Sequence, residues 1–329
     1  MKEKWKYLRW TGIIALLCLL LAACNESSNA TSDESSDSDH NDESKIEEPQ
    51  EQTITYLDKQ YTIPKEVNNI ATASLEAMED AAVLGVQPVG TITVGGQIPE
   101  YLAEELKGAE SIGEKKQPSY ETLLKLKPDV IMGSSKFQPE VAEKLNEVAP
   151  MFPVSHISTN WEENLNLMAK LTGNKEKAEE IISQYKEDAD HLTKELGNRL
   201  KDKQVVVARI RGGNIFLYSE SVYFNPVLYK DLGLQVPETI KAVKAQEMIS
   251  LEKFAEMNPD YLFVQFAESE NADNPQALEE LQKNPIWKSM KAVKEEHVFI
   301  NKVDPMAQGG TAWSKTAFLK AVEENLVKQ

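Results

Sequence analysis

One sequence pattern occurs twice in this 329-residue chain and constrains its fold more than any other feature. Residues 119–129 are SYETLLKLKPD followed by VIM, and residues 250–260 are SLEKFAEMNPD followed by YLF. In each copy we expect a serine to cap a short helix, a proline to stop it and a buried strand to follow. A weaker echo relates LGVQ at 84–87 to LGLQ at 232–235. The repeat predicts two similar halves.

Short β-rich runs alternate with amphipathic runs from residue 66 onward, which is typical of α/β organisation. The predicted strands are 69–73, 88–93, 130–133, 205–210, 261–266 and 298–301. The predicted helices are 76–84, 99–106, 120–126, 140–148, 226–232, 251–256, 275–281 and 313–326. Each half should therefore form an α/β lobe around a Rossmann-like, mostly parallel sheet.

A highly charged segment at 161–202 separates the two halves. Within 175–197 the apolar residues recur at helical spacing, and Gly173-Asn174 is the one break signal before them. A helix of this length spans about 30 Å, enough to bridge two lobes. We predict an amino-terminal lobe at 53–160 and a carboxy-terminal lobe at 203–329. A single long α-helix should connect them, with a ligand cleft between the lobes and little closure on binding.

The amino terminus has the layout of an export signal. Four basic residues within the first nine positions precede an uncharged apolar run at 13–23. The run is shorter than the roughly 20 residues that a membrane-spanning helix needs. It ends in Leu21-Ala22-Ala23-Cys24, which resembles the bacterial lipobox. We expect a lipoprotein signal peptide at 1–23 and lipidation of Cys24; the alternative is an ordinary cleavable signal followed by a stray cysteine.

Composition behind Cys24 fits a tether. Residues 25–52 are mostly Ser, Asn, Asp and Glu, with ten acids and one lysine. Such a segment cannot bury a core, so we predict that 24–52 form a disordered acidic tether behind the lipid. A plain solubilising tail is a compatible interpretation.

Charge and cysteine content exclude several functions. Of the formal net charge of −17, the leader contributes +3 and the tether −9, which leaves −11 on the rest of the chain. Nucleic acid is therefore a poor partner. Cys18 and Cys24 both lie at or before the expected processing point, so the mature chain should have no disulfide, iron–sulfur site or cysteine nucleophile.

The order and spacing of several segments resemble the siderophore-binding lipoproteins of bacterial ATP-driven importers. Besides the two repeats, these segments are LGVQPVG at 84–90, RIRGG at 209–213, LYKDLGL at 228–234 and NPIWKSMKAV at 284–293. The resemblance covers residues 66–328. It implies two α/β lobes joined by one long helix, and a monomeric binding protein rather than an enzyme. The receptor would capture a ferric siderophore, which itself sheathes the iron, so that the protein needs no cofactor or metal ligands.

The resemblance also implies a partner and a location. The receptor would be lipid-anchored on the extracellular face of the cell membrane, in a Gram-positive bacterium, and would deliver its ligand to an ABC permease. In this family a glutamate on each lobe docks onto permease arginines, and the matching positions are Glu121 and Glu252. A glutamate at a second helical position also favours the helix dipole by a few tenths to about 1 kcal/mol, and both roles can hold.

Two arginines are candidates for holding the ligand, because open α/β sheets bind ligands at the carboxyl ends of their strands. Arg209 and Arg211 follow the run 205–208 and lie on one face of an extended chain. Only four arginines accompany 32 lysines in the whole chain, and the planar guanidinium suits carboxylate-like oxygens. A surface ion pair is the alternative.

Further ligand contacts are expected in the cleft. The resemblance points to Lys115 and Lys136, where the family often has arginine; solvated surface charge is the alternative. Tyr218 and Trp313 are aromatic candidates, although packing is the commoner fate of such residues. Weaker candidates are Gln97, His156, Tyr223 and Phe224.

Other functions remain open. Haem or cobalamin could be the ligand, since the sequence does not exclude an axial Tyr or Met. A bare Zn²⁺ or Mn²⁺ site would have to rely on few histidines: His156, His191 and His297. A surface hydrolase is the alternative from another class, but the chain has no Gly-x-Ser-x-Gly, His-Glu-x-x-His or P-loop motif. The paired basic residues favour a citrate-based or catecholate siderophore over a neutral hydroxamate, without deciding between them.

Overall fold

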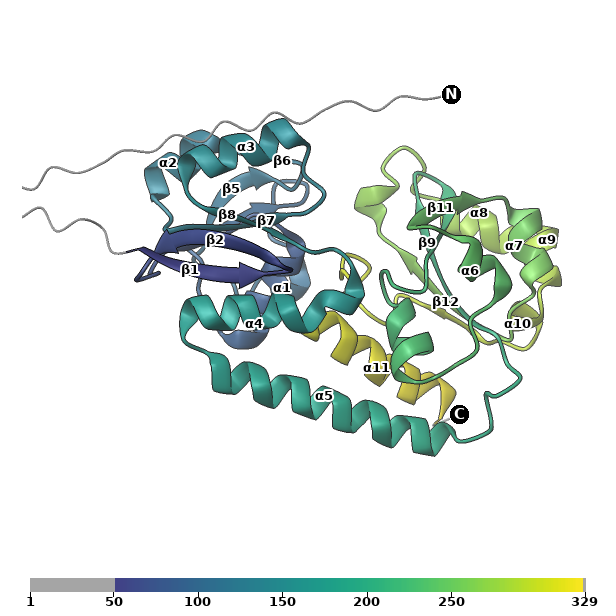
Figure 1. The fold of residues 1–329 in the computed structure, drawn as a ribbon. Coiled ribbons are helices and arrows are strands. Elements are labelled where there is room, and N and C mark those ends of the chain that lie inside the picture. The colour runs from purple at the N-terminus through teal and green to yellow at the C-terminus, as the bar shows by residue number, and fades with distance from the viewer. Residues whose placement is uncertain (1–50, 328–329) are drawn as a thin grey trace, which may run out of the picture. The chain divides into compact units, whose positions relative to one another are not determined.

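The structure, a computed structural model, describes residues 51–327 and contains the two predicted α/β lobes (Figure 1). The sheet of the first lobe has the order β6-β5-β4-β3-β7-β8. Every neighbouring pair is parallel except β5 and β6. The strands are β3 (Ile70–Thr72), β4 (Gly90–Thr93), β5 (Glu110–Glu114), β6 (Gln117–Pro118), β7 (Val130–Ser134) and β8 (Met151–Val154).

Three α-helices accompany this sheet within the described residues: α1 (Leu75–Leu84), α2 (Tyr120–Leu126) and α3 (Pro139–Val148). The helix predicted at 99–106 is wrong, because only the 3-10 turn η1 (Glu100–Leu102) forms there. Leu102 and Leu106 are both buried, so the apolar spacing that suggested a helix is real. Tight turns in the following residues, rather than a helix, accompany the burial of these two side chains.

A hairpin of β1 (Glu51–Tyr56) and β2 (Lys59–Pro64) precedes the first lobe and was not predicted. β1 begins two residues inside the segment expected as tether, so that boundary was placed too late. The hairpin forms because Ile54 and Tyr56 alternate with exposed residues and enter the core. Cys24, the signal peptide and the tether up to residue 50 lie outside the described residues.

The second lobe has the sheet order β11-β10-β9-β12-β13. Its strands are β9 (Val205–Arg211), β10 (Asn214–Tyr218), β11 (Gln246–Ile249), β12 (Tyr261–Phe266) and β13 (Val298–Ile300). β9, β12 and β13 are parallel, but β10 and β11 run antiparallel to their neighbours. Gly212 and Gly213, with φ of 52° and 73°, turn the chain straight back after β9. This sheet is therefore half parallel rather than mostly parallel.

In the part of the chain that the structure describes, five short α-helices accompany this sheet: α6 (Glu238–Ala242), α7 (Leu251–Met257), α8 (Ala277–Lys283), α9 (Pro285–Ser289) and α10 (Lys291–Lys294). The predicted helix at 226–232 is instead a π-helical turn, η3 (Val227–Asp231), and a 3-10 turn, η4 (Glu268–Glu270), follows β12.

The connection between the lobes consists of α4 (Trp161–Thr172) and the 22-residue α5 (Lys175–Leu196). Gly173 ends α4 at φ 71°, where the sequence had its break signal. The last helix, α11 (Ala312–Leu326), runs beside α5 and also packs on α1 and α4 (Figure 1). Lys315 of α11 and Tyr185 of α5 both reach Asp231 Oδ2, at 2.6 Å each. The connecting helix is thus packed firmly against its neighbours.

The sequence repeat has the same local geometry in both lobes. Ser119 and Ser250 each accept a hydrogen bond from a backbone N–H three residues later, as predicted for helix caps. Asp129 Oδ2 accepts backbone N–H groups just before β3, and Asp260 Oδ2 accepts one just before β9. The Pro-Asp pairs therefore tie each repeat to the neighbouring parallel strand, a role the sequence did not indicate.

Glu79 of α1 links the first lobe by hydrogen bonds to the segment between β13 and α11. Its Oε1 accepts hydrogen bonds from Tyr101 Oη at 2.6 Å and Gln308 N at 2.9 Å. Its Oε2 accepts bonds from Ser314 Oγ at 2.5 Å and from Thr311 Oγ1. The carboxyl group is fully buried, so these partners replace water.

We expect the contacts of Glu79 to contribute more to the stability of the fold at acidic pH than at alkaline pH. Burial raises the pKa of Glu79 from an ordinary value near 4.5 to about 7, although its hydrogen bonds oppose the rise. The folded chain therefore holds this proton more tightly than the unfolded chain. The stability contribution is complete below about pH 4.5 and is lost as the pH rises to about 7.

The variant Glu79→Gln should remove this dependence. The difference in unfolding free energy between wild type and variant, measured by urea unfolding at pH 5 and pH 8, should change by up to about 3 kcal/mol. Burial and the charges of Glu79 and Glu76 raise the pKa of neighbouring Asp80, so the measured change includes the altered titration of Asp80 in the variant. A difference that stays constant with pH would contradict the assignment.

Candidate ligand-binding site

A cavity of about 610 Å³ opens between the lobes, at the carboxyl ends of strands from both sheets. Its residues from the first lobe are Leu75, Glu76, Lys115, Lys116, Ser134, Lys136, Phe137, Gln138 and His156. Its remaining residues are Arg209, Arg211, Tyr218, Val222, Tyr223, Ala245, Gln246, Glu270 and Gln308. The cavity lies where the rule for open α/β sheets places a ligand site.

Five of the six ligand contacts expected from the sequence lie together in this cavity: Lys115, Lys136, Arg209, Arg211 and Tyr218. Trp313 does not line the cavity. It lies in the first turn of α11, and its ring packs on Tyr101 with centroids 4.6 Å apart. Of the weaker candidates, His156 and Tyr223 line the cavity, whereas Phe224 is fully buried in the core and Gln97 is not part of the lining.

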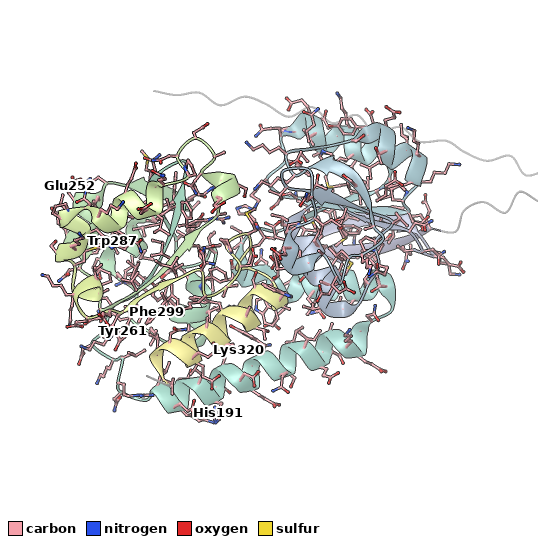
Figure 2. All side chains as sticks on the ribbon, turned by 180° about the vertical axis from the view of Figure 1, so that it is seen from behind. His191, Glu252, Tyr261, Trp287, Phe299 and Lys320 are labelled. Atoms are coloured by element: carbon pink, nitrogen blue, oxygen red, sulfur yellow. The ribbon has the colours of Figure 1, made fainter. Side chains whose placement is uncertain are left out.

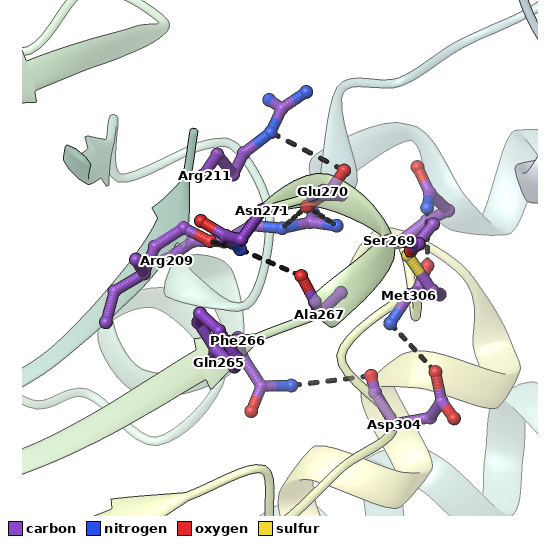
Figure 3. Close-up of polar contacts among 12 residues, drawn as sticks. Arg209, Arg211, Gln265, Phe266, Ala267, Ser269, Glu270, Asn271, Asp304 and Met306 are labelled. Carbon is purple, nitrogen blue, oxygen red and sulfur yellow. Dashed lines mark hydrogen bonds and ion pairs between the residues drawn. The ribbon is translucent and has the colours of Figure 1, made fainter. Parts of the chain in front are cut away.

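A glutamate that the sequence did not single out lies at the centre of the basic residues (Figure 3). Arg209 places Nε at 2.9 Å and Nη2 at 2.8 Å from Glu270 Oε2. Arg211 Nε lies 3.5 Å and Lys115 Nζ 3.7 Å from Oε1 of the same carboxylate. Glu270 is one of 53 acids in the chain, and its only sequence signal was its position just after a predicted strand.

The cations around the Glu270 carboxylate differ in their exposure to solvent. The Arg209 side chain is 6 % exposed and lies over the Tyr223 ring, 5.3 Å from its centroid. Burial by itself would lower the pKa of Arg209. Tyr223 and Glu270 raise this pKa by more than burial lowers it, so the guanidinium stays charged. Burial lowers the pKa of Lys115, Glu270 offsets part of that effect, and the two arginines add to it.

A second ion pair lies on the first-lobe side of the cavity. Lys136 Nζ is 2.8 Å from Oε1 of Glu76, whose side chain is almost completely buried. Beside it, Ser135 Oγ lies 2.9 Å from His156 Nδ1. Burial and the Lys136 charge lower the pKa of His156, so its imidazole is neutral at neutral pH.

The two ion pairs occupy corresponding places with opposite polarity. In the first lobe the acid, Glu76, follows β3 and the base, Lys136, follows the neighbouring strand β7. In the second lobe the base, Arg209, lies near the carboxyl end of β9 and the acid, Glu270, follows the neighbouring strand β12. The repeated architecture therefore places charged side chains at the carboxyl ends of the parallel strands in both sheets.

The lining has an excess of positive charge. It contains five basic side chains and two acidic ones, which leaves three net positive charges with His156 neutral. Such a cavity attracts and retains an anion. Within residues 51–327, no group of three or more His, Cys, Asp or Glu side chains could hold a metal ion. His191 lies on the exposed side of α5, away from the cavity (Figure 2).

A larger depression of about 850 Å³ lies elsewhere, between α4 and α5. Its lining includes Lys170, Lys175, Glu179 and Lys186, and no strand ends there. Most of its charges are the solvated side chains of two helices, so it does not have the converging groups of the first cavity.

The two glutamates expected at the permease are exposed and occupy equivalent positions. Glu121 is the second residue of α2 and Glu252 the second residue of α7. Glu121 forms a surface ion pair with Lys125 at 2.7 Å. Figure 2 shows Glu252 at the edge of the second lobe. Neither glutamate lines the cavity.

The chain belongs to the periplasmic binding protein family, which matches residues 70–304. It is 48% identical over 324 residues to the iron-uptake system-binding protein of Bacillus subtilis, covering 98% of this chain and 99% of that protein. It is 26% identical over 300 residues to the probable siderophore-binding lipoprotein YfiY of the same organism, covering 88% of each.

Among solved structures, the chain resembles the triscatecholate siderophore binding protein FeuA from Bacillus subtilis, complexed with ferri-bacillibactin. The TM-score is 0.82 at 51% sequence identity, covering 84% of this chain and 99% of that one. The predicted membership among siderophore-type binding proteins and the predicted two-lobed fold are therefore confirmed. No helix among residues 51–327 is long and apolar enough to cross a membrane.

Proposed function

We propose that this protein is an extracytoplasmic binding lipoprotein that captures a ferric siderophore and delivers it to an ABC permease. The observation that most supports this function is a group of three cations that converge from both lobes within 3.7 Å of one carboxylate: Lys115, Arg209 and Arg211. Such a group suits the anionic oxygens of a metal chelate. The family and the similar iron-uptake protein support this function. The role is binding, with the iron held by the siderophore.

The favoured ligand is a ferric tris-catecholate. This complex is a trianion, and the cavity lining carries three net positive charges. The cavity volume of about 610 Å³ lies within the usual range for small-molecule sites. The similar FeuA structure contains ferri-bacillibactin, a complex of this class.

The proposal includes an address and a partner. Lipidation of Cys24 would hold the protein on the outer face of the membrane, and the acidic tether would let the folded part reach its permease. The name of the similar lipoprotein YfiY supports the anchor. Glu121 and Glu252 would contact the permease, and the receptor would act as a monomer.

A ligand panel tests the proposal. The purified protein is titrated with ferri-bacillibactin, ferric citrate, neutral ferrichrome, haemin, cobalamin and Zn²⁺, and quenching of tryptophan fluorescence is followed. We expect ferri-bacillibactin to bind most tightly, because it matches the charge of the cavity. Tighter binding of ferric citrate, ferrichrome, haemin, cobalamin or Zn²⁺ would refute the tris-catecholate assignment.

A further inference from the structure

The carboxylate of Glu270 occupies the position in the basic group that an anionic ligand oxygen would be expected to take. It receives Arg209 and Arg211 from β9 of its own lobe, and Lys115 from the turn between β5 and β6 of the other lobe. The Glu270 side chain is only 9 % exposed. One buried carboxylate therefore links the lobes and neutralises part of the charge that faces the ligand.

Hydrogen bonds hold the backbone around Glu270 in place (Figure 3). Asn271 Nδ2 donates to the carbonyls of Ile210 and Ala267, at 3.0 and 2.8 Å. The Glu270 carbonyl accepts from Gly212 N at 3.0 Å. The loop is thus tied to β9, the strand that carries both arginines, so the short distance between the acid and Arg209 is built into the lobe.

Arg209 needs this counter-charge when the cavity is empty. A guanidinium that is 6 % exposed is strongly destabilising without an anion beside it. Its Nη2 lies 2.8 Å from Glu270 Oε2. The pair therefore satisfies the charge of Arg209, although Nη2 itself is buried without an aligned hydrogen bond among the described residues.

We propose that Glu270 is an internal counter-anion that sets the charge of chelate the cavity accepts. It stabilises the empty receptor by neutralising Arg209, and it keeps the net positive charge of the lining at three instead of four. Repulsion from Glu270 lowers the affinity for every anion, while a neutral chelate is little affected. This inference rests on the proposed capture of an anionic ferric chelate.

The test compares two variants with the same change in formal charge. Glu270→Gln removes the carboxylate at the cations, and Glu268→Gln removes an exposed one in the same 3-10 turn, outside the cavity lining. Affinities for ferri-bacillibactin and for neutral ferrichrome are measured by fluorescence titration at two salt concentrations. Glu270→Gln should bind ferri-bacillibactin about tenfold tighter and with a steeper salt dependence, without tighter binding of ferrichrome. Glu268→Gln should stay within about twofold of wild type.

A second measurement does not need a siderophore. Without ligand, Glu270→Gln should melt at a lower temperature than wild type, because Arg209 loses its counter-charge, and added sulfate should restore more of its stability than it adds to wild type. Glu270→Asp, which keeps the charge, should return both affinity and melting temperature towards wild type.

Unchanged or weaker binding of ferri-bacillibactin by folded Glu270→Gln would overturn the counter-anion role; weaker binding would mean that Glu270 mainly positions the arginines. An unchanged melting temperature of the empty variant would overturn it as well. Failure of the wild type to bind any ferric siderophore would instead refute the proposed function, and the sulfate and melting measurements would still decide the role of Glu270.

Discussion

Replacing both Arg209 and Arg211 by Ala should weaken the binding of ferri-bacillibactin at least about tenfold, which corresponds to about 1.4 kcal/mol. The double variant removes two of the five basic side chains of the cavity lining. It also leaves Glu270 close to the ligand without the arginines that neutralise it. The loss of two attractive charges and the repulsion between Glu270 and the anionic ligand both weaken binding.

The control for this experiment is Arg199→Ala, because Arg199 is exposed and lies outside the cavity. Among residues 51–327 its side chain bonds only to the carbonyl of Glu195, in its own segment. Arg211→Ala alone keeps the buried pair of Arg209 and Glu270 and should have an intermediate effect. Melting temperatures establish that each variant is folded. Unchanged affinity of the folded double variant would exclude this cavity as the ligand site.

Reversing the charge of Glu121 and Glu252 together, to Lys, should abolish uptake of radiolabelled ferri-bacillibactin while leaving its binding intact. The Glu121 side chain is 81 % exposed, Glu252 is exposed as well, and neither lines the cavity. Each is the second residue of a helix of the repeated unit, one on each lobe. A permease that presents arginines to both positions would meet two like-charge contacts, which disfavour docking.

The matched control reverses Glu176 and Glu238, which are exposed acids in the first turns of α5 and α6. Uptake is measured in cells whose only receptor for this ligand is the variant, and affinity is measured on the purified proteins. Normal uptake by the Glu121 and Glu252 variant would contradict docking through these residues. A loss of affinity would assign them to the ligand site instead.

Elements governed by local interactions could be predicted from the sequence. The caps at Ser119 and Ser250 join a side chain to a backbone group three residues away, so a short segment contains both partners. The helix expected at 175–197 is α5, which ends one residue earlier. The prediction missed β10, although it pairs with β9 through a two-residue turn, and the edge strand β11, whose partner β10 lies about 30 residues away in the sequence. Residues 99–106 form turns instead of a helix.

The binding site could be predicted only in its basic half. Arginines are rare in this chain, so two of them at a strand end were conspicuous, whereas Glu76 and Glu270 were hidden among 53 acids. Trp313 was misplaced because the sequence does not tell which side of α11 faces the cavity. Its ring lies on Tyr101 instead.

The repeat, the helical spacing at 175–197 and the charge pattern by themselves determined two α/β lobes, a long connecting helix and a basic ligand site. The tertiary structure alone decided which acids meet those bases. Lys136 and Glu76 are 60 residues apart, and Arg209 and Glu270 are 61 apart. Such pairs form only when neighbouring parallel strands bring their carboxyl ends together, because nothing local links the partners.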